Sequence, residues 1–124
     1  MKHQSIIFVT IVRAYKYPSI NMKDEFKPLQ LKKNDATHRF EMVVENQTAF
    51  IAFKELNQKI YLIHTEVPSA LENRGIASAI IEKTLNYIEQ HQYKLIALCP
   101  AVVAFIRRHP EWKRILDLEQ TDLV

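Results

Sequence analysis

The sequence predicts a single α+β domain with a mixed sheet, and three observations carry that prediction. Apolar and polar residues alternate in three successive segments, 39–45, 48–55 and 60–67, which are joined by short polar loops. Apolar residues at helical spacing follow from residue 75 to about residue 92. A short apolar strand, 93–98, comes directly after that helix. A strand, a helix and a strand in this order imply a parallel pair with the helix packed on the sheet.

The first three strands read as an antiparallel meander. Phe40, Met42 and Val44 recur with period two, which places them on one face. Residues 46–47 are the expected hairpin loop, because Asn46 tolerates the left-handed conformation that glycine would otherwise supply. Asn57 marks the next turn, and residues 28–33 are a candidate fourth strand.

Two helices are expected to pack on this sheet. In the helix over 75–92, the buried half is expected to contain Ile76, Ile80, Ile81, Leu85, Tyr87 and Ile88. The solvent-facing half is expected to contain Glu82, Lys83, Asn86, Glu89 and Gln90. The second helix follows the strand over 93–98, with Cys99 at its N-cap and Pro100 at its first position. A last amphipathic turn is expected over 111–118.

The composition limits which classes of function are possible. The chain has 124 residues, enough for one domain, and its 48% hydrophobic and 25% charged residues are typical of a globular protein. A formal net charge of +3 suits a small anionic ligand and falls short of a nucleic-acid-binding footprint. The apolar run over 5–12 is too short to cross a bilayer, so no membrane association is expected.

The N-terminal residues stand apart from the rest. Residues 1–21 end at a natural break, and the segment after it begins with Met22. We therefore expect residues 1–21 to be an extension and residues 22–124 to form the domain. The alternative is that the extension is an edge strand of the same sheet.

Cysteine and histidine usage argues against disulfides and metals. Cys99 is the only cysteine, so no disulfide or cysteine-based zinc site forms within one chain, and a cytoplasmic, reducing location is expected. No two of the five histidines are spaced i, i+4, so no metal site is expected.

Gly75 is the only glycine in the chain, although average usage is about 7%. It stands between a predicted strand and a predicted helix, where backbone N–H groups converge and the helix dipole is positive. Ala77 and Ser78 beside it are small. The position suits an anion that approaches the backbone closely, and the alternative is a glycine that only relieves a tight turn.

The segment HTEVPSALENRGIASAIIEKTL, residues 64–85, resembles the acetyl-CoA-binding segment of the GNAT superfamily of N-acetyltransferases. In that pattern Val67 ends the strand, Gly75 fills the first glycine position and Ala77 fills the last small position. Glu72 stands where the family usually has Arg or Gln, so it is not expected to bind phosphate.

Four short motifs, HTEVP, GIAS, CP and HPEW, are similar to the small stand-alone YjdJ-type or GNAT-like members, and the likeness covers about residues 28–116. It implies a shortened acyl-CoA N-acyltransferase fold with acetyl-CoA bound where two neighbouring strands splay apart. It places the pyrophosphate against the backbone of residues 74–78, and the backbone at Val67 against the thioester carbonyl. The residues implied at the pyrophosphate are Arg74, Gly75, Ile76, Ala77 and Ser78.

Three side chains are candidates for acetyl transfer. His64 and Glu66 share one strand face, and either can accept a proton from an incoming ammonium. Cys99 at a helix N-cap is expected to have a lowered thiol pKa, which permits an acetyl-cysteine intermediate. The alternatives are a structural histidine, a solvated glutamate and a cysteine that is only a small buried hydrophobe.

The predicted function is acetyl transfer from acetyl-CoA to an unidentified amine, on a small molecule or a protein. Phe105 stands about where many members of the superfamily place a tyrosine that protonates the leaving thiolate. That departure keeps a second interpretation open, a non-catalytic acyl-CoA-binding or interaction module.

Overall fold

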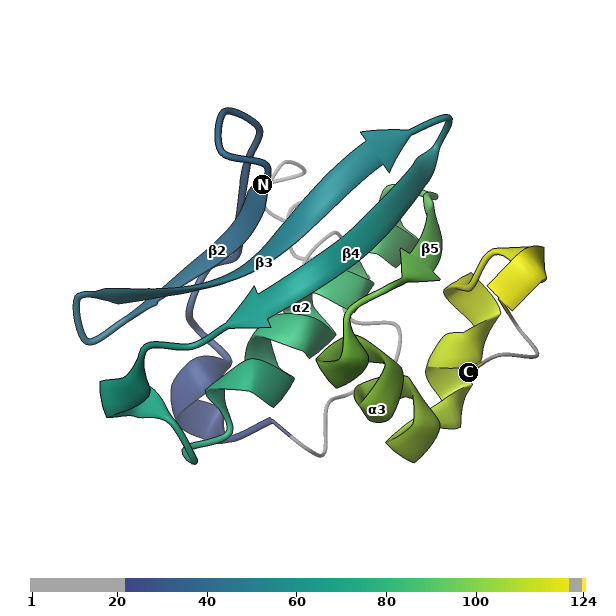
Figure 1. The fold of residues 1–124 in the computed structure, drawn as a ribbon. Helices are drawn as coiled ribbons and strands as arrows, with labels where there is room; N and C mark the ends of the chain where they lie inside the picture. Colours follow the sequence, from purple (N-terminus) through teal and green to yellow (C-terminus); the bar gives the residue numbers. More distant parts are fainter. Residues whose placement is uncertain (1–21, 121–123) are drawn as a thin grey trace, which may run out of the picture.

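The computed structural model describes residues 22–120 and Val124. Its centre is a five-stranded sheet in the order β1-β2-β3-β4-β5, and helices α2 and α3 pack on one face of it (Figure 1). The strands are β1 (Lys32–Asn34), β2 (Arg39–Val44), β3 (Gln47–Leu56), β4 (Lys59–Glu66) and β5 (Lys94–Ala97). The helices are α2 (Ile76–Gln90) and α3 (Pro100–Arg108), with short 3-10 turns η1 (Asp24–Phe26), η2 (Ser69–Leu71), η3 (Pro110–Ile115) and η4 (Leu118–Gln120).

The predicted topology is confirmed. β1 to β4 pair antiparallel, and α2 crosses over so that β5 pairs parallel with β4. The candidate strand over 28–33 is displaced, because β1 begins only at Lys32. The predicted extension, residues 1–21, lies outside the described residues and stays a prediction.

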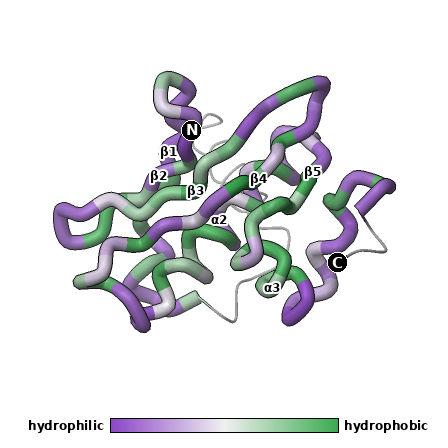
Figure 2. The backbone as a smooth tube through the Cα atoms, viewed as in Figure 1, coloured by the Kyte–Doolittle hydropathy of each residue, from purple (hydrophilic) through white to green (hydrophobic). Residues whose placement is uncertain are grey.

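The first hairpin loop lies one residue earlier than predicted. Val44 pairs with Gln47, so the loop consists of Glu45 and Asn46, with φ of 50° and 64°. Two left-handed residues match the right-handed twist of the flanking strands, which is why the loop closes at this position. Figure 2 shows this turn as a hydrophilic tip at the end of the sheet.

One face of the sheet forms the core with the two helices. Alternate residues of β2 and β3, such as Phe40, Met42 and Ile51, are buried against α2, as period two requires. α3 adds Val102, Phe105 and Ile106. None of the described helices covers the opposite face (Figure 1).

The expected solvent-facing half of α2 is partly wrong. Glu82, Lys83 and Asn86 are only 6%, 5% and 6% exposed. For Lys83 the reason is tertiary: the chain that leads into β1 packs on this side, and the ammonium donates to the Lys27 carbonyl at 3.0 Å. Glu89 is half-buried because it accepts a hydrogen bond from Arg114 at 2.6 Å, whereas Gln90 is exposed as predicted.

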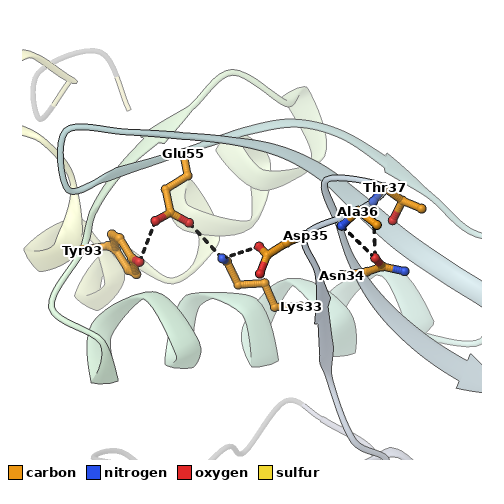
Figure 3. A network of polar contacts seen from close by, with 7 residues as sticks. All are labelled: Lys33, Asn34, Asp35, Ala36, Thr37, Glu55 and Tyr93. Carbon is orange, nitrogen blue, oxygen red and sulfur yellow. Dashed lines mark hydrogen bonds and ion pairs between the residues drawn. The ribbon is translucent and has the colours of Figure 1, made fainter.

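A network of ion pairs and hydrogen bonds connects β1, β3 and the start of β5 (Figure 3). The Lys33 ammonium lies 2.7 Å from Asp35 and 2.8 Å from Glu55, and the Tyr93 hydroxyl donates to Glu55 at 2.8 Å. Burial by itself lowers the pKa of Lys33, but the two carboxylates outweigh it and raise that pKa. The network joins β1, β3 and the residue before β5.

The outer edge of β5 is covered by the C-terminal segment. The Gln120 side chain accepts from the Ala97 N–H at 2.6 Å and donates to the Ala97 carbonyl at 3.0 Å. Leu116 forms a parallel bridge with Leu95. The segment therefore satisfies backbone groups that an exposed edge strand would leave open.

Candidate active site

The parallel strands β4 and β5 diverge partway along. Their pairing runs from Lys59 with Lys94 to Leu62 with Ala97. β4 then continues to Glu66, whereas the chain after β5 turns, and the N–H groups of Leu98 and Cys99 both lie 2.9 Å from the Leu62 carbonyl oxygen. In the part of the chain that the structure describes, no strand pairs with the β5-facing edge of residues 63–66.

A bulge precedes this open edge. Phe53 pairs with Leu62 but Ala52 pairs with His64, so Ile63 has no opposite residue on β3. An extra residue in one strand bends it and re-aims the side chains beyond it. The bulge thus separates the half of β4 that pairs with β5 from the half that carries the candidate residues.

Cys99 lies beside the open edge. It is the N-cap residue of α3, as predicted, and it is 3% exposed. Its Sγ lies 3.2 Å from the Thr65 Oγ1, within hydrogen-bond distance. Thr65 was not predicted from the sequence, although strand alternation puts it on the face opposite to His64 and Glu66, the face that the helices cover (Figure 1).

His64 and Glu66 lie together on the other face of β4. They pair with Ala52 and Phe50, whereas Thr65 between them pairs with the buried Ile51. The His64 Nε2 and the Glu66 Oε1 are 3.5 Å apart, and the two side chains are 60% and 59% exposed. The three predicted catalytic side chains therefore fall into two sets on opposite faces of one strand: Cys99 with Thr65, and His64 with Glu66.

The N-terminus of α2 carries no cap that would compete with an anion. Gly75 is its N-cap, no side chain caps the first turn, and that turn contains no acidic residue. The N–H groups of the first turn have no acceptor within the helix, and the helix dipole adds partial positive charge there. The Ile76 side chain is buried, so this residue presents only its backbone.

Gly75 is left-handed, with φ of 85°. A left-handed φ alone does not require glycine in this chain, because other residues adopt one: His38, Glu45, Asn46, Asn57, Gln58, Asn73 and Gln92. Crowding does not require it either, since a Cβ on Gly75 would meet Lys23 Cε at 3.8 Å and Phe26 Cε2 at 3.9 Å, ordinary contacts. The missing Cβ leaves a small space between the exposed Gly75 backbone and the side chains of Lys23 and Phe26.

Two cationic side chains lie near this loop. The Arg74 guanidinium forms a 2.6 Å ion pair with Glu45, which raises the pKa of Arg74 and lowers the pKa of Glu45. Arg74 therefore ties the loop to the β2–β3 hairpin. Lys23, which was not predicted from the sequence, directly precedes η1, and its Cε lies 3.8 Å from the position that a Cβ on Gly75 would occupy.

Two further predicted positions, Val67 and Phe105, contact the core. Val67 directly follows β4 and packs partly against the core. Phe105 is 1% exposed and brings no hydroxyl to the site. No group of three metal-ligating side chains occurs within residues 22–120, and no helix of that part is long and apolar enough to cross a membrane.

Comparison with known proteins identifies the family. A family model described as GCN5-related N-acetyl-transferase matches residues 39–115, more than half of the chain. The NMR structure of a GCN5-like protein from Staphylococcus aureus has a similar fold, with a TM-score of 0.56 and 19% identity over 73% of this chain and 90% of that one. The matched region contains the diverging strands, the loop at Gly75 and Cys99. The chain belongs to the GCN5-related N-acetyltransferase family.

Proposed function

We propose that this protein binds acetyl-CoA between the diverging ends of β4 and β5 and transfers the acetyl group to an amine. The observation that carries this is the open edge of β4, which begins beside Cys99 and leads through residues 67–74 to the N-terminus of α2. An exposed strand edge offers N–H and C=O groups to an extended chain, and the pantetheine arm is an extended chain with amide groups.

The pyrophosphate would bind at the start of α2. Uncapped N–H groups, the positive helix end and the absence of a Cβ at Gly75 together favour a phosphate there. Lys23, the residue before η1, would add a side-chain charge, and the ion pair between Arg74 and Glu45 would hold the loop in place. In this proposal Arg74 contributes its backbone, and its side chain positions the loop.

The thioester would lie between Val67 and Cys99. The Cys99 thiol would give up its proton to water as Sγ attacks the acetyl carbonyl; a bond would form between that carbon and Sγ, and the bond to the coenzyme A sulfur would break. Coenzyme A leaves as a thiolate and takes up a proton from water. Thr65 is placed to hold Sγ in position through its hydroxyl. Because one thioester replaces another, the step is close to thermoneutral.

The acceptor amine would approach the open face of the sheet, where His64 and Glu66 are exposed. It would reach the acetyl group past the edge of residues 63–66, because no described strand pairs with that edge on the β5 side. A carboxylate attracts an ammonium group, and one member of the pair would take its proton. The neutral amine would then attack the acetyl carbon on Sγ, the bond from that carbon to Sγ would break, and Cys99 would leave as a thiolate that takes up a proton from water. We expect Glu66→Gln or His64→Gln to lower kcat/KM by roughly 10²–10⁴-fold, depending on which residue is the base. Steady-state assays with the best available amine measure this.

Glu72→Gln is the matched control, because Glu72 is an exposed carboxylate in the loop before Gly75 and has no assigned role. Its kcat/KM is expected to stay within about threefold of the unmodified protein. If both His64→Gln and Glu66→Gln also stayed within that limit, neither residue would be the base, and proton transfer to solvent would replace them.

The second candidate function is a non-catalytic acyl-CoA-binding module. Two observations favour it: Phe105 supplies no hydroxyl to protonate a leaving thiolate, and Cys99 is almost completely buried. Both functions need acetyl-CoA to bind, so only turnover separates them.

The test has two stages. At acetyl-CoA about 100 times its Kd, the native state gains about 2.7 kcal/mol, which raises the melting temperature by several degrees. Release of free thiol from acetyl-CoA with a panel of primary amines then measures transfer. A melting shift without amine-dependent thiol release would favour the binding module, and the absence of any shift would overturn both functions.

A further inference from the structure

A second polar site lies on α2, away from its N-terminus. A cleft of about 330 Å³ separates the chain over 27–31 from the helix. The helix side is formed by Lys83, Asn86, Tyr87 and Gln90. None of the candidate acetyl-transfer residues lines this cleft.

Lys83 is the unusual member of the cleft. It is 5% exposed, and its ammonium donates one hydrogen bond, to the Lys27 carbonyl at 3.0 Å. An ammonium has three N–H donors, so two remain without a protein acceptor among the described residues. Burial lowers the pKa of Lys83, and the neighbouring charge of Glu82 offsets part of that effect. Lys83 thus lines the cleft with a buried ammonium group that uses one of its three hydrogen-bond donors.

The rest of the lining selects for an anion. None of the described lining residues carries a carboxylate, and several carry amides. Of the two lysines, Lys27 already pairs with Asp24 at 2.8 Å, so Lys83 is the cation that the cleft offers to an anion. Asn86 is 6% exposed, and its amide NH₂ donates to the Glu82 carbonyl at 3.1 Å; its second N–H has no acceptor among residues 22–120. The facing wall contains Pro28, Leu29 and Leu31, which are apolar.

We propose that this cleft binds a small carboxylate with a short aliphatic tail. The carboxylate pairs with the Lys83 ammonium and accepts from the Asn86 amide, which completes donors that the fold leaves unused. The tail lies against Leu29 and Leu31. A charge-assisted pair in a partly buried site is stronger than one in water, so Lys83 dominates the affinity.

The experiment uses the full chain labelled with ¹⁵N and follows backbone amide shifts during titration with sodium butyrate. Sodium chloride at equal ionic strength and sodium phosphate are the comparison anions. Saturable shifts with butyrate, confined to residues 27–31 and 83–90, are expected. In Lys83→Met the apparent Kd is expected to rise at least tenfold, and in Lys94→Met, an exposed lysine of β5, it is expected to stay unchanged.

Lys83→Gln is the second variant, because its uncharged amide keeps a polar group at the position if methionine disturbs the fold. Each variant's own spectrum reports whether it is folded. Three results would overturn the proposal: shifts as large with chloride, shifts that never saturate, or unchanged butyrate affinity in a folded Lys83 variant. Tighter binding of phosphate than of butyrate would overturn the carboxylate class.

Discussion

Replacing Cys99 by alanine is expected to lower the rate of acetyl transfer at least ~100-fold and to leave acetyl-CoA binding within about threefold. The reason is chemical: without Sγ no acetyl-enzyme forms, while the β4 edge and the α2 N-terminus that would bind the cofactor remain. Single-turnover thiol release measures the chemical step. Intact-protein mass after acetyl-CoA treatment reports whether an acetyl group is carried on the unmodified chain.

Thr65→Val is the companion variant, because it removes the hydroxyl that lies 3.2 Å from Sγ and keeps the side-chain shape. It is expected to slow transfer less than Cys99→Ala does. If Cys99→Ala transferred acetyl at the normal rate, the amine would attack the thioester directly, and Cys99 would be only a buried N-cap residue. Folding of Cys99→Ala is checked by its melting temperature, since alanine is close to cysteine in size.

Replacing Gly75 by valine is expected to abolish the stabilisation by acetyl-CoA, a loss of about 2.7 kcal/mol at ligand 100 times the Kd of the unmodified protein. A branched side chain would fill the space between the Gly75 backbone and the side chains of Lys23 and Phe26, and would thereby narrow the approach of a pyrophosphate to the start of α2. The left-handed φ of 85° adds a separate cost, about 1–2 kcal/mol, to the stability without ligand. The informative quantity is therefore the melting shift caused by acetyl-CoA within each variant.

Asn73→Val is the matched control for that backbone cost. Asn73 lies in the same loop, is exposed and has φ of 64°, but it does not cap the helix. Its valine variant is expected to melt lower without ligand and to keep the shift on addition of acetyl-CoA. A full shift in Gly75→Val would leave Gly75 as a turn residue, and equal loss in both variants would point to loop conformation instead of phosphate contact.

Much of the site was predictable because it depends on local pattern. Strand alternation put His64 and Glu66 on one face, and Pro100 marked the start of α3, which made Cys99 its N-cap. Thr65 and Lys23 were not predicted. A contact with Thr65 depends on where β5 ends against β4, and Lys23 comes from a segment with no periodic pattern.

The difference between local pattern and contact with distant segments also explains the errors on α2. Helical periodicity places a side chain at an angle around the axis, and it assigned Lys83 and Asn86 to the solvent side. Whether solvent is there depends on which other segments pack on that side. Residues 27–31 pack on that side of α2. Lys83 is therefore buried beside a cleft, although the sequence predicted that it faces solvent.

The sequence by itself determined the order of strands and helices, the parallel crossover, the single glycine at the start of α2 and the family likeness. These follow from period, propensity and spacing along the chain, which are local properties. Only the tertiary structure decided where β4 and β5 diverge, that Arg74 pairs with Glu45, and that Cys99 lies beside Thr65 while His64 lies on the opposite face of β4. Those features require two distant segments to be placed against each other, and packing of the whole chain sets that placement.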